Sequence, residues 1–482
     1  MNPFPRICMT SLLFGTLAYG VGVAGDQLDR TQRPKGKPAP VIHLPEIQKS
    51  SLKNGLQVWL VENHKLPLVA FSLVIPSGTD RDPAGQPGIA SMTADMLDEG
   101  TATRSSLQIA DDLDAIGANL GTFANTDGSF INLGTLSRYL DKALEIYADV
   151  VVHPVFPEKD FSRLKKQRLA SLLQQHDQPT AIANNSFNFI LYGGSHPYGN
   201  NPMGTEQSVQ SMTIDDLKKF YHTYYRPGNA TLVVVGDADL GHLTGTLEKL
   251  FGSWESGPVP TAVLPNPPAA GQRTIYLIDK PNAAQSEIRI GYPALARSTP
   301  DYFPVILMNR MLGGQFTSRI NLNLRERHGY TYGANSSFRF FKGPGPFVAS
   351  AGVITDKTDS SLVEFMHELT LMREKGMTAE ELAYAKKGAV GSFALAFETP
   401  AQIAGALQSI VLYGLPENYF NSYLQNIESV TLGDVQRVAS AYIDPSRMAI
   451  VVVGDLAKIR SKIAALGLGE VVLCDTDGKK LP

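Results

Sequence analysis

The stretch "MTIDDLKKFYHTYYRPGNATLVVVGD" (Met212–Asp237) recurs later in the chain as "VTLGDVQRVASAYIDPSRMAIVVVGD" (Val430–Asp455). The final aspartates, the prolines and the first threonines of the two stretches all stand 218 positions apart. Each stretch predicts a capped helix, a proline turn and a buried strand. Because solenoid units are far shorter than this period, the pattern indicates duplication of a whole domain.

A looser match marks the front of each copy, where "LPLVAFSLVIPSG" from Leu66 corresponds to "AAQSEIRIGYPAL" from Ala283. In the first copy, Asn54-Gly55 and Asp127-Gly128 predict hairpin turns, and helices are predicted from Ser137 and from Glu158. Strands in hairpins alternating with helices favour an α+β fold. We therefore expect two duplicated α/β-sandwich domains with largely antiparallel sheets.

The chain has 482 residues, which exceeds the usual size of one hydrophobic core and agrees with two domains. Arg6 precedes an apolar run that ends in small residues. This pattern predicts a secretory signal peptide that is cleaved near Ala24 or Gly25. The alternative is that the segment stays uncleaved as a membrane anchor. The expected boundaries are a signal peptide at 1–25, an extended N-terminal arm at 26–48, a first domain at 49–256, a proline-rich linker at 257–273 and a second domain at 274–482.

The inventory of reactive side chains contains no obvious site. No two of the nine histidines stand three to five residues apart, which excludes the usual helical zinc site. The chain has no G-x-S-x-G stretch, and Cys474 lies in an apolar strand pattern typical of an inert buried thiol. A net charge of −3 and a pI near 6.3 do not indicate a surface that binds nucleic acid.

Several motifs together resemble the pitrilysin/insulinase family of metallopeptidases, in particular its processing-peptidase-like branch. They are "LKNGLQVWLVEN", "SGTDRDPAGQPGIA", the "ML" and "GT" of Met96–Thr101, "NPMGT" at Asn201, both "VVVGD" ends and "LRERHGYTYG". The resemblance extends from about Ser50 to Val472. It implies two such domains forming half of a clamshell.

The resemblance also shows which chemistry is missing. Active members carry an inverted H-x-x-E-H motif and a further glutamate ligand about eighty residues downstream. On "GIASMTADML" the two histidines fall on Ser91 and Asp95 and the glutamate on Ala94, while the downstream glutamate falls near Ser171. All four are absent, so we expect this chain to bind no metal or other cofactor and to be inactive alone.

The second half keeps a different part of the family pattern. Family members carry an arginine and a tyrosine seven residues apart that hold the substrate backbone and the developing oxyanion, and Arg325 and Tyr332 match them. Bacterial members of this branch include heterodimers in which one subunit bears zinc and the other bears only the arginine and tyrosine. The resemblance thus implies the non-zinc subunit.

The expected function is that of a periplasmic, non-catalytic subunit of a heterodimeric zinc metalloendopeptidase. A zinc-bearing paralogue would supply the metal and the general base for cleaving peptides, and a free strand edge would take the peptide by β-addition. Two alternatives stay open: a structural scaffold or core subunit of a larger envelope complex, and a peptidase with another metal geometry. Neither nucleic acid nor a stable membrane span after signal cleavage is expected.

Overall fold

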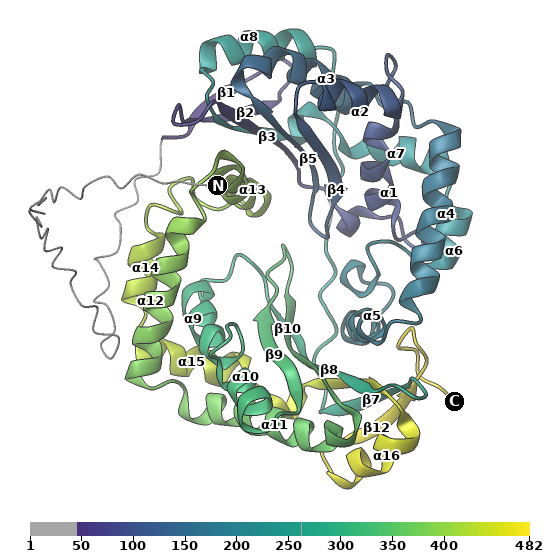
Figure 1. Ribbon diagram of the computed structural model, residues 1–482, viewed down its shortest axis with the longest axis vertical. Coiled ribbons are helices and arrows are strands. Elements are labelled where there is room, and N and C mark those ends of the chain that lie inside the picture. Colours follow the sequence, from purple (N-terminus) through teal and green to yellow (C-terminus); the bar gives the residue numbers. More distant parts are fainter. Residues whose placement is uncertain (1–45, 262) are drawn as a thin grey trace, which may run out of the picture. The chain divides into compact units, whose positions relative to one another are not determined.

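The computed structural model describes residues 46–482 with the exception of residue 262 (Figure 1). The predicted signal segment and most of the predicted N-terminal arm lie outside the described residues. Within the described part, no helix is both long and apolar enough to cross a membrane.

The first copy of the duplicated unit forms one six-stranded sheet with the strand order β1-β2-β6-β3-β5-β4. Only the β2–β6 pair is parallel. Its strands are β1 (Gln48–Ser51), β2 (Gln57–Glu62), β3 (Leu68–Ile75), β4 (Asn119–Ala124), β5 (Ser129–Leu136) and β6 (Thr231–Gly236). Its helices are α1 (Ile89–Asp95), α2 (Ser106–Asp114), α3 (Leu140–Val152), α4 (Glu158–Gln175), α5 (Pro179–Tyr192), α6 (Glu206–Ser211), α7 (Ile214–Tyr224) and α8 (Leu240–Phe251).

The second copy forms another six-stranded sheet, with the order β12-β7-β11-β8-β10-β9. Its strands are β7 (Thr274–Asp279), β8 (Gln285–Leu295), β9 (Thr331–Phe338), β10 (Gly345–Ile354), β11 (Ala449–Gly454) and β12 (Glu470–Cys474). Its helices are α9 (Tyr302–Leu312), α10 (Arg319–Asn321), α11 (Thr358–Lys375), α12 (Ala379–Leu395), α13 (Pro400–Tyr413), α14 (Tyr423–Ser429), α15 (Leu432–Tyr442) and α16 (Leu456–Ala465). Two six-stranded, mostly antiparallel sheets confirm the predicted α+β class.

The two repeated stretches fold alike. Thr213 caps α7 and Thr431 caps α15, each accepting a hydrogen bond from the backbone N–H three residues on and so satisfying a free donor of the first turn. A short helical turn follows at each proline, and then β6 or β11 lies buried inside its sheet. The predicted order of helix, turn and strand is confirmed in both copies.

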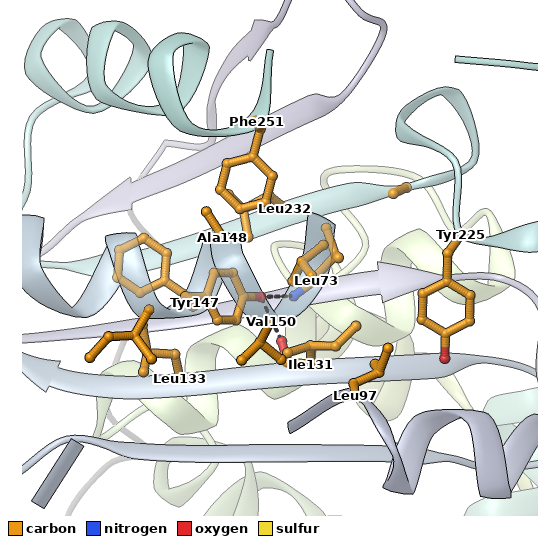
Figure 2. Packing of buried hydrophobic residues seen from close by; sticks show 14 of the residues in the cluster. Leu73, Leu97, Ile131, Leu133, Tyr147, Ala148, Val150, Tyr225, Leu232 and Phe251 are labelled. Atoms are coloured by element: carbon orange, nitrogen blue, oxygen red, sulfur yellow. Dashed lines mark hydrogen bonds between the residues drawn. The ribbon is translucent and has the colours of Figure 1, made fainter. Parts of the chain in front are cut away.

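The main core of the first copy lies between its sheet and its own helices. Tyr147 on α3 is fully buried there, and its hydroxyl donates to the Ile131 carbonyl at 2.7 Å and accepts from the Leu73 N–H at 3.1 Å (Figure 2). A buried hydroxyl needs such partners, because an unpaired one costs about 1–3 kcal/mol. The tyrosine therefore connects α3 to the neighbouring strands β3 and β5.

The other face of each sheet is covered by a helix from the other copy. Helix α13 of the second copy packs on β3 and β6, where Ile403, Leu407 and Ile410 meet Val233 and Val235. Helix α5 of the first copy packs in the same way on β8 and β11 of the second sheet. Each sheet thus has two covered faces, and each copy depends on the other for one of them.

A loop of the second copy also enters the first copy. The Lys342 ammonium donates to the carbonyls of Pro76 and Asp127, at 2.7 and 2.6 Å. The buried Asp127 carboxylate accepts from the Lys342 backbone N–H at 2.9 Å and from the Tyr198 hydroxyl at 3.1 Å. These bonds join the β4–β5 turn to the segment before β10.

Candidate functional site

Helix α1, on which the metal motif of an active relative would lie, begins at a turn that is tightly fixed. Gly88 has φ +97°, and a Cβ there would approach Met203 O to 2.8 Å, so only glycine fits. The Asp82 carboxylate accepts from the Gly88 and Ala90 N–H groups at 2.7 Å each. Burial raises the pKa of Asp82 to about 7, while the two backbone donors oppose the rise.

Arg168 of α4 fills the space between two of the motif positions. Its guanidinium donates from Nη1 to the Ser91 hydroxyl at 2.9 Å and to the Gly88 carbonyl at 3.0 Å, and from Nη2 to the Asp95 carboxylate. Ser91 in turn donates to the Pro202 carbonyl at 2.6 Å. One cation therefore cross-links the first and last turns of α1 to α4.

The Arg168 side chain is 6% exposed, and the Asp95 side chain is 43% exposed. Burial lowers the pKa of Arg168, and the Asp95 charge opposes that shift. An arginine starts from so high a pKa that it stays charged at neutral pH. The site therefore keeps a buried positive charge, held by a side chain that can neither bind a metal ion nor accept a proton.

The other two motif positions offer no catalytic group. Ala94 is fully buried, so that position faces packed side chains. Ser171 lies on α4 one turn after Arg168 and is partly buried. Across residues 46–261 and 263–482, no three His, Cys, Asp or Glu side chains gather closely enough to hold a metal ion. The residues present at these positions do not fit a zinc ion.

The sequence motif marks Ser91, Ala94, Asp95 and Ser171 but does not point to Arg168. Its signal was the spacing in "RLAS", where Arg168 precedes Ser171 by one helical turn and so faces the same side of α4.

Arg325 lies in the π-helical turn η6 (Leu322–Arg327), and its side chain is 35% exposed. Its guanidinium stacks on the ring of Phe316, 4.5 Å from the ring centroid, and its Nε lies 3.4 Å from Glu326 Oε1. Phe316 is itself 62% exposed. The cation is therefore held at the surface with most of its donors still available.

Tyr332 is the second residue of β9, which lies at the edge of the described sheet and pairs with β10. Its side chain is 90% exposed, and no hydrogen bond to its hydroxyl occurs within the described part of the chain. The turn between it and Arg325 is closed by the Gly329 N–H donating to the Arg325 carbonyl at 3.1 Å and by the Tyr330 N–H donating to the Leu324 carbonyl at 2.8 Å. Both predicted residues are thus held on one short surface segment.

Two family models match the chain. The model for insulinase (peptidase family M16) matches residues 57–195, and the model for the peptidase M16 inactive domain matches residues 211–389. The chain belongs to peptidase family M16. This family membership confirms the resemblance to insulinase-type peptidases that the sequence motifs carry.

Relatives of this M16 chain carry different names. It is 25% identical over 353 residues to an uncharacterized zinc protease, YmxG, of Bacillus subtilis, covering 73% of this chain and 85% of that protein. It is 26% identical over 404 residues to a protein named non-peptidase homolog YmxG of Helicobacter pylori, and the match covers 82% of this chain and 91% of that protein. A crystal structure of a peptidase M16 inactive domain from Pseudomonas fluorescens matches with a TM-score of 0.80 and 29% identity, covering 85% of this chain and 98% of that one.

Proposed function

We propose that this M16 chain is the zinc-less, non-catalytic subunit of a heterodimeric zinc metalloendopeptidase that acts on peptides. A zinc-bearing paralogue supplies the metal and the general base. This chain supplies Arg325, Tyr332 and a strand edge for the peptide. The pair works in the periplasm, to which the N-terminal segment directs this chain.

The observation that carries this proposal is the contact of Arg168 with Ser91 and Asp95. A guanidinium seated among the motif positions leaves neither the ligands nor the space for a metal, so the chain is unsuited to hydrolysis by itself. The name non-peptidase homolog, given to a relative that aligns with 82% of this chain, points the same way.

The state of Arg325 and Tyr332 supports a role toward another molecule. A phenol that is 90% exposed beside a partly exposed guanidinium contributes little to the stability of its own fold. The phenol and the guanidinium stabilise a developing oxyanion by their position and charge alone. They can therefore act on a peptide whose cleavage is carried out by another chain.

The test is peptide cleavage by this chain reconstituted with a zinc-motif paralogue encoded in the same genome. Tyr332→Phe is expected to lower kcat about ten- to a thousandfold, the scale for removing one oxyanion donor. Arg325→Ala is expected to raise KM as well, because the guanidinium that holds the peptide backbone is lost. Size-exclusion chromatography on the same samples measures the dimer.

Two matched variants serve as controls. Arg327→Ala removes an exposed arginine two residues from Arg325, and Tyr384→Phe removes the hydroxyl of an exposed tyrosine on α12. Both are expected to retain the wild-type rate. Wild-type rates from Tyr332→Phe and Arg325→Ala in an intact dimer would contradict the proposed role and favour a structural scaffold.

A further inference from the structure

The second copy contains a cavity of about 480 Å³ that the proposed function does not use. It lies among α9, α12, α13 and the residues just before α14, and Figure 1 shows α12 and α14 running beside α9. Aromatic rings form much of its wall, among them Phe393, Tyr419 and Tyr423. This volume falls within the usual range for small-molecule sites, about 300–1,000 Å³.

Two arginines enter this apolar cavity. Arg297 is 9% exposed and stacks on Tyr302, with its guanidinium carbon 3.8 Å from the ring centroid. Its Nη2 donates to the Tyr419 hydroxyl at 2.7 Å, which leaves the proton of that hydroxyl free to donate. Burial raises the pKa of Tyr419 to about 12, so the hydroxyl stays a neutral donor.

Arg310 reaches the cavity from α9, and its Nε is buried without a hydrogen-bond partner in the described structure. Its guanidinium lies against Gly388 of α12: a Cβ at Gly388 would come 2.7 Å from Nη2 and 2.9 Å from Nε. The missing side chain at Gly388 therefore makes the room that Arg310 occupies.

No carboxylate balances these two charges. Among residues 46–261 and 263–482, neither Arg297 nor Arg310 forms an ion pair, and the side chains lining the cavity include no aspartate or glutamate. Buried charges are normally paired, because an unpaired one loses its hydration without compensation. Arg297 is buried and Arg310 is partly buried, and neither has a carboxylate partner, so both guanidiniums can offer their charge to an anion from outside the chain.

We propose that this cavity binds a carboxylic acid that carries an aromatic or aliphatic group. Arg297 and Arg310 bind the carboxylate, and the aromatic rings of the cavity pack around the apolar group. The planar fork of a guanidinium matches a carboxylate better than any neutral group. Two sources offer this chemistry: a free apolar carboxylic acid, and the C-terminal residue of a peptide.

The test is calorimetric titration of the full chain with 4-phenylbutyrate. One saturable site with a Kd below about 1 mM is expected, and 4-phenylbutanol, which has the same body without charge, should bind at least about tenfold more weakly. A tetrapeptide ending in phenylalanine is titrated with a free and with an amidated C-terminus. Binding of the free acid form identifies a peptide terminus as an accepted source, and binding of 4-phenylbutyrate alone restricts the site to small acids.

Two variants locate the site. Arg310→Gln is expected to weaken 4-phenylbutyrate binding at least about tenfold. Gly388→Ala is expected to weaken it as well, because the new methyl displaces the guanidinium, while alanine favours the helix by about 1 kcal/mol and so protects folding. Arg460→Gln, which removes an exposed arginine of α16, is the matched control and should bind like the wild type.

The proposal is overturned if no saturable binding of either acid occurs, or if the alcohol binds as well as 4-phenylbutyrate. It is equally overturned if Arg310→Gln and Gly388→Ala, both folded by circular dichroism, keep the wild-type affinity. None of these measurements requires the zinc-bearing partner, so their outcome does not depend on the proposed function.

Discussion

Arg168 on α4 and Ser91 on α1, 77 residues apart in the chain, meet through a buried hydrogen bond of 2.9 Å. The resemblance of the sequence motifs implies that Ser91 takes the position of the first histidine of an active M16 peptidase. If the four motif ligands were present, a zinc ion bound to them would connect α1 to α4. In this chain the Arg168 guanidinium makes that connection, so the arrangement of α1 and α4 needs no metal.

The first prediction is that Arg168→Met lowers the free energy of unfolding by about 2–4 kcal/mol. Removing one partner of a buried pair leaves Ser91 and Asp95 without a donor, and the half-exposure of Asp95 keeps the cost below that of a fully buried carboxylate. Urea denaturation measures the effect. Lys166→Met, at an exposed position of the same helix, is the control and should change stability by less than about 0.5 kcal/mol.

The second prediction concerns restoration of the metal motif. Histidines at 91 and 95 with glutamates at 94 and 171 are expected to bind no zinc that survives dialysis, because Arg168 still occupies the space between the ligands and repels a dication. Adding Arg168→Ala to these four changes should allow about one retained zinc per chain. Elemental analysis after dialysis decides the outcome, and equal zinc content with and without Arg168 would contradict the role assigned to it.

The third prediction is a pH dependence that arises from Asp127. Burial raises its pKa to about 6, against the lowering effect of Lys342; Tyr198 and Asp80 also lie near it. In the unfolded chain the same carboxyl titrates near 4. The folded state therefore binds its proton more tightly, and the stabilisation is present below about pH 4 and is lost as the pH rises to about 6.

Asp127→Asn should remove this contribution. Between pH 4 and 7 the wild type is expected to lose up to about 3 kcal/mol more of its free energy of unfolding than the variant does. Asparagine keeps an acceptor for the Lys342 N–H, so the variant should still fold. Asp111→Asn, at an exposed aspartate of α2, is the control and should show the wild-type profile in urea titrations over this pH range.

The fourth prediction tests the packing of α13 on the first sheet. Leu407→Ala removes a buried side chain from that contact and should cost about 2–4 kcal/mol. The chain has only two tryptophans, Trp59 and Trp254, and both lie in the first copy. Their fluorescence transition in urea should therefore shift although the substitution is in the second copy. Leu395→Ala, at a side chain that is 55% exposed, should leave the transition unchanged.

The parts of the fold that were predictable are those encoded by short-range patterns. Capping threonines at 213 and 431, the proline turns and the runs of valine specify helix, turn and strand within about 26 residues, and all are confirmed. Asn54-Gly55 and Asp127-Gly128 likewise lie at the predicted hairpins. Local hydrogen bonds, turn residues and short apolar runs decide these features, so a single sequence carries them.

The features that were not predicted depend on contacts between distant segments. Nothing local in α5 or α13 indicates that each packs on the sheet of the other copy, because an apolar helix face fits either sheet. The role of Arg168 likewise depends on its long-range hydrogen bonds to Gly88 and Ser91, of which the sequence gives only the hint of its position one turn before Ser171.

The exchange of α5 and α13 between the copies has an evolutionary consequence. A half-length chain would expose one full apolar sheet face, and its displaced helix would have nothing to cover. Once that exchange existed, neither half could be lost, transferred or replaced alone. Genes of this kind are therefore expected to diverge as whole two-copy units, so that an inactive member arises by substitutions in a complete chain and not by deletion of a half.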